Sequence, residues 1–568
     1  MSSVSLKDYG IIGNKGHAAL VDRFGGIDWC CFPEIDSPSH FGALEYGPNG
    51  GRFQIIPHGE YHSEQHYLQR TQILETAFET PYGRARLTDW MPIETVPVIH
   101  RRIEVVQGRV QFFLSCAPRF ESGNDIPGAE YQNGEVVFRG RNPSSIARLA
   151  SNIPLELVGE RGPSAARASF TLETGQSAIF RWSWGFSRRD LITPVSEIHP
   201  RPAIDAWRSW AHHCIPAGCP FAGPWHDTVV RSSMLLHILS DPETGAIAEG
   251  LTDEARYANI RDGAWALQAM TNLGYREECQ AWFQWLYDLL ARDGAEGLEA
   301  AYKLNGGHKS REKSRFHLSL YGHVMLAATE YYNCFGRLPT GLWPRLSSIA
   351  DFAGQAWRRP DAGFDEVNPK PDHFTASKLY CWVALDRAIQ LAHSIKVRTP
   401  ARWGQERDIL HRTLCEQGFD ESIGSFTRAF GDSTLDAAVL LMPILGFLPM
   451  DDARMAGTVS TIQTELSEGV LLRRSSGDKD ANLLASLWLV QCLALGGHVS
   501  DASDRLAEIC SYATPLGIFG ENVDRTSGET TGHFPAIQVH LALINAALYV
   551  GAARGRRIPS GTLLGKTA

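Results

Sequence analysis

Between residues 224 and 553 the sequence contains about a dozen helical segments in succession, and this feature restricts the fold more than any other. Many are apolar on nearly every side, such as LYGHVMLAATEYYNCFG at residues 320–336 and ANLLASLWLVQCLALGG at 481–497. A surface helix keeps a polar face, whereas a helix that is apolar all round lies in a core. We therefore expect a closed double ring of helices, an (α/α)6 barrel with a buried inner ring. A stacked solenoid is the alternative, but no repeat of about 34 or 40 residues is visible.

The N-terminal third has a different pattern. Short apolar runs alternate with Gly, Pro, Ser and Asn, and two stretches, GHAALVDRFGGIDWCCF (16–32) and RRIEVVQGRVQFFLSC (101–116), carry glycines between two such runs. This pattern predicts hairpins, the second around Gly108, within an antiparallel β-sandwich. The expected domains are a β-sandwich at 1–202, a linker with a helix at 203–223, the barrel at 224–555 and a tail at 556–568.

Charge and composition exclude some classes of partner. The net charge of −9 gives no general affinity for nucleic acid or anionic membranes. The stretch MSSVSLKDYGIIGNKG lacks the features of a secretory signal, and no apolar run approaches 20 residues, so no membrane span is expected. Eleven scattered cysteines indicate buried thiols in a reducing, cytoplasmic setting. HHCIPAGC (212–219) lacks a second ligand cluster, so no zinc site is expected. The oligomeric state, a homo-oligomer included, stays open.

Polar residues gather in four segments between the predicted helices: EARYANIRDGAW (254–265), NGGHKSREKSRFH (305–317), GFDEV (363–367) and GIFGENVDRTSGETTGHFP (517–535). In a helical ring, loops on one face line a common pocket. Glycoside hydrolysis needs one carboxyl that gives a proton to the leaving oxygen and a second that activates water or attacks the sugar. Acids on two such loops fit this need, although a single loop acid is more often an N-cap or a solvated charge.

Four segments, in order along nearly the whole chain, resemble glycoside hydrolase family 15 in its bacterial trehalase-like branch; the family contains glucoamylases and glucodextranases. They are YGIIGNKGHAALVDRFGGIDWCCFPEIDSPSHFGALE (9–45), RYANIRDGAWAL (256–267), GFDEV with HFTASKLYCWVALDRAIQLA (373–392), and GIFGENVD with TGHFPAIQVHLALINAAL. The resemblance implies a β-sandwich followed by an (α/α)6 barrel. It also implies an inverting, exo-acting α-glycosidase that binds a small carbohydrate and needs no metal or other cofactor.

By position, the resemblance implies that Glu366 is the general acid and Glu521 the general base. Arg473 and Arg474 match the place of a sugar-binding arginine, and the sequence leaves open which of them faces inward. The expected sugar-binding residues are Tyr257, Asn259, Arg261, Asp262, Asp365, His373, Lys378, Arg473 and His533. For His373 and Lys378 structural packing is an equal alternative, and His533 is expected to order the loop behind Glu521.

The chain departs from the family at the pocket. Asn259 and Asp365 stand where the family usually has Trp, and the basic loop 308–315 replaces the branch's usual pattern. Polar side chains there remove flat stacking faces and add hydrogen-bonding groups. We therefore expect weak activity on starch, maltose and plain trehalose, and better activity on a differently decorated or linked small α-glycoside. A glycoside phosphorylase and a non-catalytic sugar-binding protein are the alternatives.

Overall fold

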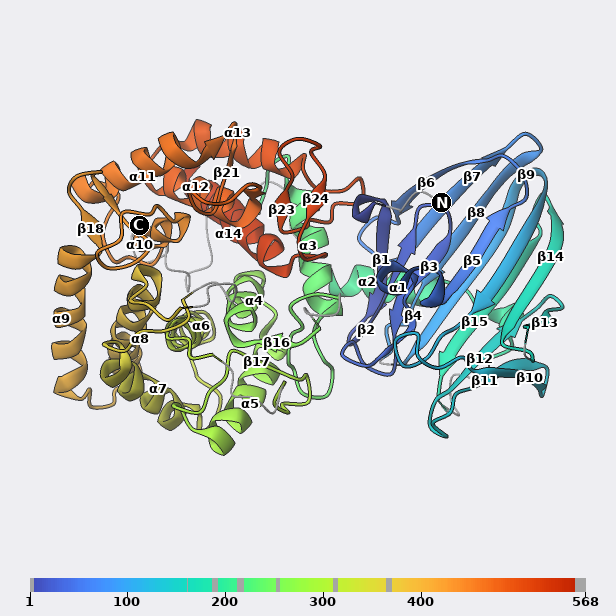
Figure 1. Ribbon diagram of the computed structural model, residues 1–568, viewed down its shortest axis with the longest axis horizontal. Coiled ribbons are helices and arrows are strands. Elements are labelled where there is room, and N and C mark those ends of the chain that lie inside the picture. Colours follow the sequence, from blue (N-terminus) through green and yellow to red (C-terminus); the bar gives the residue numbers. More distant parts are fainter. Residues whose placement is uncertain are drawn as a thin grey trace. The chain divides into compact units, whose positions relative to one another are not determined.

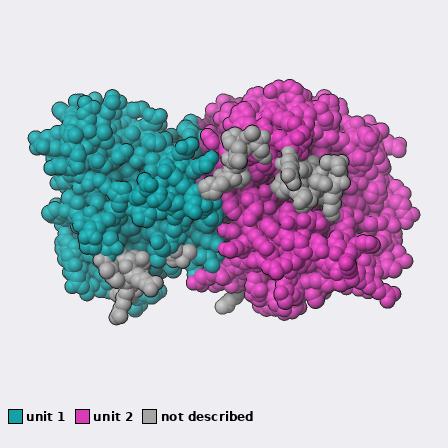
Figure 2. Space-filling model, turned by 180° about the vertical axis from the view of Figure 1, so that it is seen from behind, with its two compact units in different colours: residues 1–211, 237–242, 514–516 teal, residues 212–236, 243–513, 517–568 magenta. Residues whose placement is uncertain are grey.

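The computed structural model describes residues 5–94, 96–160, 162–185, 193–211, 219–251, 256–309, 315–363 and 370–556 (Figure 1). The chain divides into two compact units, coloured separately in Figure 2. The first comprises residues 1–211, 237–242 and 514–516, and the second the remainder. Helix α2 (Arg201–Trp210) lies in the first unit, so the segment predicted as a linker does not stand apart from both units. The predicted tail, apart from residue 556, lies outside the described residues.

The first unit is an antiparallel β structure, as predicted. Its strands are β1 (Tyr9–Asn14), β2 (His17–Asp22), β3 (Gly26–Cys31), β4 (Ser39–Phe41), β5 (Arg52–Pro57), β6 (His62–Tyr67), β7 (Leu74–Thr80), β8 (Gly83–Trp90), β9 (Val98–Ala117), β10 (Gly128–Gln132), β11 (Glu135–Arg139), β12 (Ile146–Ser151), β13 (Glu156–Val158), β14 (Ala165–Glu173) and β15 (Ser177–Trp184). The short helix α1 (Ala43–Tyr46) follows β4.

The predicted hairpin at Gly25–Gly26 is confirmed, because β2 and β3 pair antiparallel on either side of it. The hairpin predicted at Gly108 is wrong, because β9 runs unbroken through that glycine. The first half of β9 pairs with β8 and β15 and the second half with β5 and β14, so one strand joins two layers. Gly108 has φ +81°, and a Cβ there would lie 2.2 Å from the Tyr82 carbonyl oxygen. The glycine therefore serves an irregular, close strand pairing rather than a turn.

The second unit is a double ring of helices (Figure 1). The inner ring contains α4 (Ile260–Leu273), α6 (Ser319–Phe335), α8 (Thr375–Ser394), α10 (Leu441–Ile444) with the 3-10 turn Ala437–Leu440 before it, α12 (Leu483–Leu495) and α14 (Ile537–Ala553). The outer ring contains α3 (His226–Ile238), α5 (Arg276–Asp293), α7 (Leu342–Ala356), α9 (Ala401–Gln417), α11 (Ala453–Leu466) and α13 (Val499–Cys510).

Helices of the inner ring are buried more completely than helices of the outer ring, as the sequence predicts. Helix α12 is buried at every position from Leu483 to Ala494, whereas α9 buries only Trp403, Leu410 and Leu414. Helices that are apolar all round thus form the inner ring, and helices with a single apolar stripe cover them. The predicted antiparallel sheet domain followed by a helical ring is confirmed.

Inner and outer helices alternate along the chain, so the inner helices all begin at the same end of the barrel. We call this end the mouth; it lies at the first turns of α4, α6, α8, α12 and α14. Short strands occur in the connecting segments: β16 (Ala258–Asn259), β17 (Ala301–Tyr302), β18 (Phe419–Asp420), β19 (Ser425–Phe426), β20 (Ser467–Glu468), β21 (Leu471–Leu472), β22 (Ala481–Asn482), β23 (Asn522–Val523) and β24 (Thr530–Thr531).

Candidate active site

The Arg261–Asp262 pair lies in the first turn of α4, at the mouth. Arg261 Nε donates to Asp262 Oδ1 at 2.8 Å, and Nη2 lies 3.4 Å from Oδ2. Asp262 is buried, while the Arg261 side chain keeps 13% of its surface exposed. The amino end of a helix is a favourable place for a carboxylate side chain such as that of Asp262. The pair therefore presents a fixed guanidinium at the mouth.

Asn259 caps helix α4. Its Oδ1 accepts a hydrogen bond from the Arg261 backbone N–H at 3.0 Å, and the residue is only 4% exposed. An Asn at this position satisfies a backbone N–H that the helix leaves unpaired. Asn259 thus has a structural role as a helix cap. Contact of Asn259 with a sugar stays a prediction.

Gln538, in the first turn of α14, holds Asp262 from the other side. Its Nε2 donates to Asp262 Oδ2 at 3.0 Å and to Glu249 Oε1 at 3.2 Å. Because two carboxylates receive the amide hydrogens, the orientation of the amide is fixed, and Oε1 faces away from both acids. This residue was not predicted from the sequence. A signal was present, since Gln538 is a polar residue in the first turn of the mostly apolar IQVHLALINAALYV.

Glu521 stands directly before β23 in the small sheet at the mouth. Its carbonyl oxygen accepts from the backbone N–H of Leu483, the first residue of α12, and its Oε2 lies 3.5 Å from the His533 backbone nitrogen. Gly532 has φ +80°, and a Cβ there would lie 2.8 Å from Oε2. The glycine therefore lets the segment before α14 close over the Glu521 carboxylate. The backbone of His533 lies beside Glu521, and contact of its imidazole with a sugar stays a prediction.

Asp365 and Glu366 fall in 364–369, outside the described residues, but the base of their segment is well defined. The backbones of Asp361 and Asp372 exchange two hydrogen bonds of 3.0 and 2.9 Å. Oδ2 of Asp361 accepts from the Leu318 N–H at 3.1 Å and from the Ser377 hydroxyl at 2.8 Å. These contacts place Asp361 and Asp372, which flank the segment, beside the first turns of α6 and α8.

Lys378 and His373 pack around this base. Lys378 is fully buried, and its Nζ donates to the Arg359 carbonyl oxygen at 2.5 Å. Burial lowers the pKa of Lys378. The His373 ring stacks on Phe430 with centroids 6.2 Å apart. Contact of Lys378 or His373 with a sugar stays a prediction.

Arg474, rather than Arg473, lies against an aromatic side chain of the inner ring. Its guanidinium carbon is 5.0 Å from the centre of the Trp488 ring, and Nε donates to Asp436 at 2.8 Å. Arg473 instead donates to the carbonyl oxygens of Glu465 and Ser476 and pairs with Glu468 at 3.4 Å. The two arginines therefore turn to different neighbours, and sugar binding by Arg473 stays a prediction.

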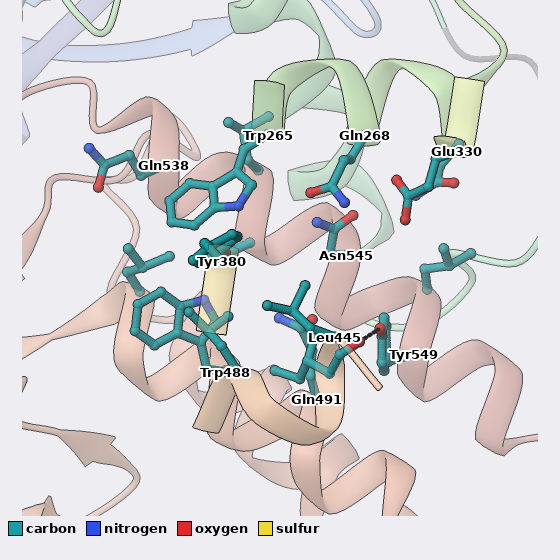
Figure 3. A pocket seen from close by; sticks show the side chains of 17 residues that line it. Trp265, Gln268, Glu330, Tyr380, Leu445, Trp488, Gln491, Gln538, Asn545 and Tyr549 are labelled. Carbon is teal, nitrogen blue, oxygen red and sulfur yellow. Dashed lines mark hydrogen bonds between the residues drawn. The ribbon is translucent and has the colours of Figure 1, made fainter. Parts of the chain in front are cut away.

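Beneath these charged groups lies an aromatic layer that we call the floor, formed by Trp265, Tyr380 and Trp488 (Figure 3). The rings of Trp265 and Trp488 meet edge to face, with centroids 6.3 Å apart. Arg261 lies 5.8 Å from the Trp265 ring, as Arg474 lies over Trp488. Helix α4 and the segment between β21 and β22 thus bring the two arginines against one aromatic layer. The floor residues were not named from the sequence, because tryptophans on apolar helices are indistinguishable from ordinary core.

The described part of the basic loop is tied to its surroundings. His308 Nδ1 lies 3.1 Å from Glu299, and its Nε2 lies 3.8 Å from Asp293. Lys309 Nζ is 4.5 Å from the centre of the Tyr257 ring, a cation–π contact. This contact links the loop to Tyr257, which belongs to the segment leading into α4. Arg311 and Lys313 lie outside the described residues.

Two kinds of feature are absent from the described residues. Among them, no group of three or more His, Cys, Asp or Glu side chains is arranged to hold a metal ion. No described helix has the length and apolar character that a membrane crossing requires. Of the segment HHCIPAGC, only Cys219 is described, and it is buried.

Comparisons with known proteins agree with this architecture. The family Trehalase-like, N-terminal matches residues 2–195, and Glycosyl hydrolases family 15 matches residues 318–484. The chain is 30% identical to a trehalase of Mycolicibacterium smegmatis, over 98% of this chain and 93% of that protein. It is also 30% identical to a trehalase of Mycobacterium tuberculosis, over 96% of this chain and 89% of that protein.

A bacterial glucoamylase solved in complex with acarbose has a similar structure, with a TM-score of 0.78 over 100% of this chain and 96% of that one. The sequence identity is 12%, so this likeness bears on the fold alone. Fold, mouth and sequence relatives together define a glycoside hydrolase. The chain belongs to glycosyl hydrolase family 15, and its sheet domain is of the trehalase-like N-terminal type.

Proposed function

We propose that the protein is an inverting, exo-acting α-glycosidase that hydrolyses a small α-glycoside. Glu366 donates a proton to the leaving glycosidic oxygen. Glu521 removes a proton from a water molecule, whose oxygen attacks the anomeric carbon from the opposite face. The bond from that carbon to the leaving oxygen breaks, and the released sugar has the opposite anomeric configuration. The reaction requires no cofactor.

The observation that carries this proposal is the convergence of two distant segments at the mouth. Gln538 joins the segment that follows Glu521 to Asp262 through a hydrogen bond of 3.0 Å. Glu521 in turn contacts the first residue of α12, whose Trp488 meets Trp265 of α4. A carboxylate, a guanidinium–carboxylate pair and an aromatic floor therefore occupy one end of the barrel.

In this proposal Arg261 and Asp262 hold hydroxyl groups of the sugar that is cleaved off. The planar guanidinium of Arg261 donates in a fixed direction, because Asp262 accepts from its Nε and Nη2. Gln538 restrains Asp262 in turn. Such restraint matters because a misplaced sugar raises the barrier even when both catalytic carboxyls are intact.

Trehalose is the first substrate to test, because the relatives that match nearly the whole chain are named trehalases. The contrary expectation, a preference for a decorated or differently linked glycoside, rested on Asn259 and Asp365. Asn259 serves as a helix cap, so that expectation now depends mainly on Asp365. A side-by-side measurement of kcat/KM on trehalose, maltose, soluble starch and substituted α-glycosides decides between the two substrate predictions.

The function itself is tested with Glu366→Gln and Glu521→Gln. We expect each to lower turnover by about 10²–10⁴-fold while the melting temperature stays close to that of the wild type. Asp524→Asn is a matched control in the Glu521 segment, because its Oδ1 accepts from the Thr526 and Ser527 N–H groups, and an amide oxygen can do the same. Full activity in both glutamine variants would refute the assignment.

Assays with and without inorganic phosphate separate the proposal from its alternatives. A phosphorylase would need phosphate and would release a sugar phosphate. A non-catalytic protein would bind sugars and release nothing. We expect release of free sugar that does not depend on phosphate.

A further inference from the structure

A cavity lies inside the inner ring, below the aromatic floor (Figure 3). It offers about 50 Å³ to the centres of water-sized molecules. Its lining follows α4 from Trp265 to Asn272, which at 1.5 Å per residue is about 10 Å along the barrel axis. The cavity therefore extends from the sugar pocket's floor into the core of the barrel.

Polar side chains interrupt the mostly apolar and aromatic wall of this cavity. Gln268 on α4, Glu330 on α6, Gln491 on α12 and Asn545 on α14 all line it. Figure 3 shows the side chains of Gln268, Glu330 and Asn545 gathered around one part of the space. Between residues 541 and 550 of α14, Asn545 alone is not fully buried. Because α14 belongs to the inner ring and Asn545 lines the cavity, we attribute this accessible surface to the cavity.

The buried carboxyl group of Glu330 is only partly hydrogen-bonded. It is 5% exposed, and its Oε2 has no hydrogen-bond partner within the described part of the chain. Gln268 hydrogen-bonds to the carboxyl group. Two nitrogens of the nearby Arg387 are engaged elsewhere, since Nη1 donates to Asp386 and Nη2, at 2.6 Å, to the Leu445 carbonyl oxygen. A buried carboxyl oxygen without a partner is rare in native proteins and indicates a bound water or ion.

We propose that this cavity is a water site built into the barrel, which holds about three ordered water molecules between Glu330 Oε2, Gln268 and Asn545. The size fits, because one water needs about 10–15 Å³ of such space. The chemistry fits as well, because the amides offer donors and acceptors while Glu330 accepts. An apolar ligand would leave these groups unpaired. In this proposal, ordered water lies directly below part of the aromatic floor.

High-resolution crystallography of the wild-type protein tests the proposal directly. We expect water-shaped density within hydrogen-bonding distance of Glu330 Oε2 and Asn545, and no xenon in the cavity after pressurisation. Xenon enters dry apolar cavities, so xenon at this position would overturn the proposal. Density from an ion or an organic molecule would overturn it too.

A second measurement uses variants and needs no crystal. Magnetic relaxation dispersion counts water molecules that stay inside a protein for long times. We expect Asn545→Leu to reduce this count, because it fills space and removes a polar partner, while Glu330→Gln retains it. Asn333→Leu, on α6 outside the cavity lining, is the matched control and is expected to change nothing. An unchanged count in a folded Asn545→Leu protein would contradict the proposal.

Discussion

Each unit of the molecule contains a buried arginine–aspartate pair, and the two pairs are put to different uses. In the sheet unit, Arg101 and Asp89 are both 0% exposed. Arg101 donates to Asp89 through Nε and Nη2 at 2.7 and 3.0 Å, and also to the carbonyl oxygens of Phe53 and Gly25. In the barrel unit, Arg261 also pairs with its aspartate through two nitrogens but keeps part of its surface exposed at the mouth.

This difference in exposure and partners distinguishes a structural ion pair from one that can bind a ligand. All three nitrogens of Arg101 donate to oxygens inside the sheet unit, so the pair crosslinks strands. Arg261 is held rigidly by one carboxylate while its exposed part faces the mouth. The motif Arg–Asp in a sequence says nothing about this difference. Burial and the identity of the remaining partners decide it.

The largest expected effect concerns the sheet pair. Arg101→Met leaves Asp89 as an unpaired buried charge, so we expect a loss of about 3–5 kcal/mol in the free energy of unfolding, measured by chemical denaturation. Arg84→Met is the matched control. Arg84 pairs with Glu79 at 2.6 Å on the exposed surface, and removal of such a pair costs about 1 kcal/mol or less. A loss of similar size in both variants would show that Arg101 contributes no more than a surface pair.

The next effect concerns the barrel pair. Arg261→Lys keeps the charge but loses the planar fork, so we expect kcat/KM to fall by about 10²-fold with little change in melting temperature. This outcome would sharpen the comparison, because the same residue type would then control stability in one unit and catalysis in the other. Near-normal kinetics would make Arg261 structural, like Arg101.

A smaller effect is expected from Gln538→Met, which keeps the length of the side chain and removes the amide. Asp262 and Glu249 then lose the donor between them. We expect kcat/KM to fall about tenfold, mainly through KM, because the sugar is bound by a less rigid pair. Gln284→Met, at an exposed hydrogen bond to Asp288 on α5, is the control and should retain wild-type kinetics. A fall in unfolding free energy without a change in KM would mean that Gln538 only stabilises the fold.

The smallest effect is a pH dependence of stability. Burial raises the pKa of Glu330 from 4.5 to about 7, while Gln268 and Arg387 oppose the shift. The folded protein therefore holds a proton that the unfolded chain releases between about pH 4.5 and 7, so this group's contribution to stability falls as pH rises through that window. Glu330→Gln should flatten this part of the stability profile. An unchanged profile would show that Glu330 does not titrate there.

The sequence predicted the architecture well, because helical periodicity and glycine-rich punctuation are local properties. The error at Gly108 has the same origin. A glycine between two apolar runs predicts a turn, and only the neighbouring strand shows that it serves a close pairing. Asn259 illustrates a missed local signal, since an Asn before a helix is a common cap.

The candidate site was less predictable, because its contacts join segments that are far apart in sequence. Gln538 and Asp262 meet only after the ring closes, and Arg473 and Arg474 differ only in which way each side chain turns. The family resemblance supplied the catalytic glutamates, which periodicity alone would not have singled out. The roles of Glu366 and Glu521 remain predictions.

The central claim is that water, activated by Glu521, replaces the leaving group with inversion. Proton NMR during the first minutes of hydrolysis of an α-glycoside whose leaving group is not a sugar tests this step, because the two anomers of the single released sugar have separate signals. We predict that the newly formed hemiacetal appears first as the β-anomer and reaches the equilibrium mixture only later. Initial release of the α-anomer would show retention and would contradict the proposed roles of both glutamates.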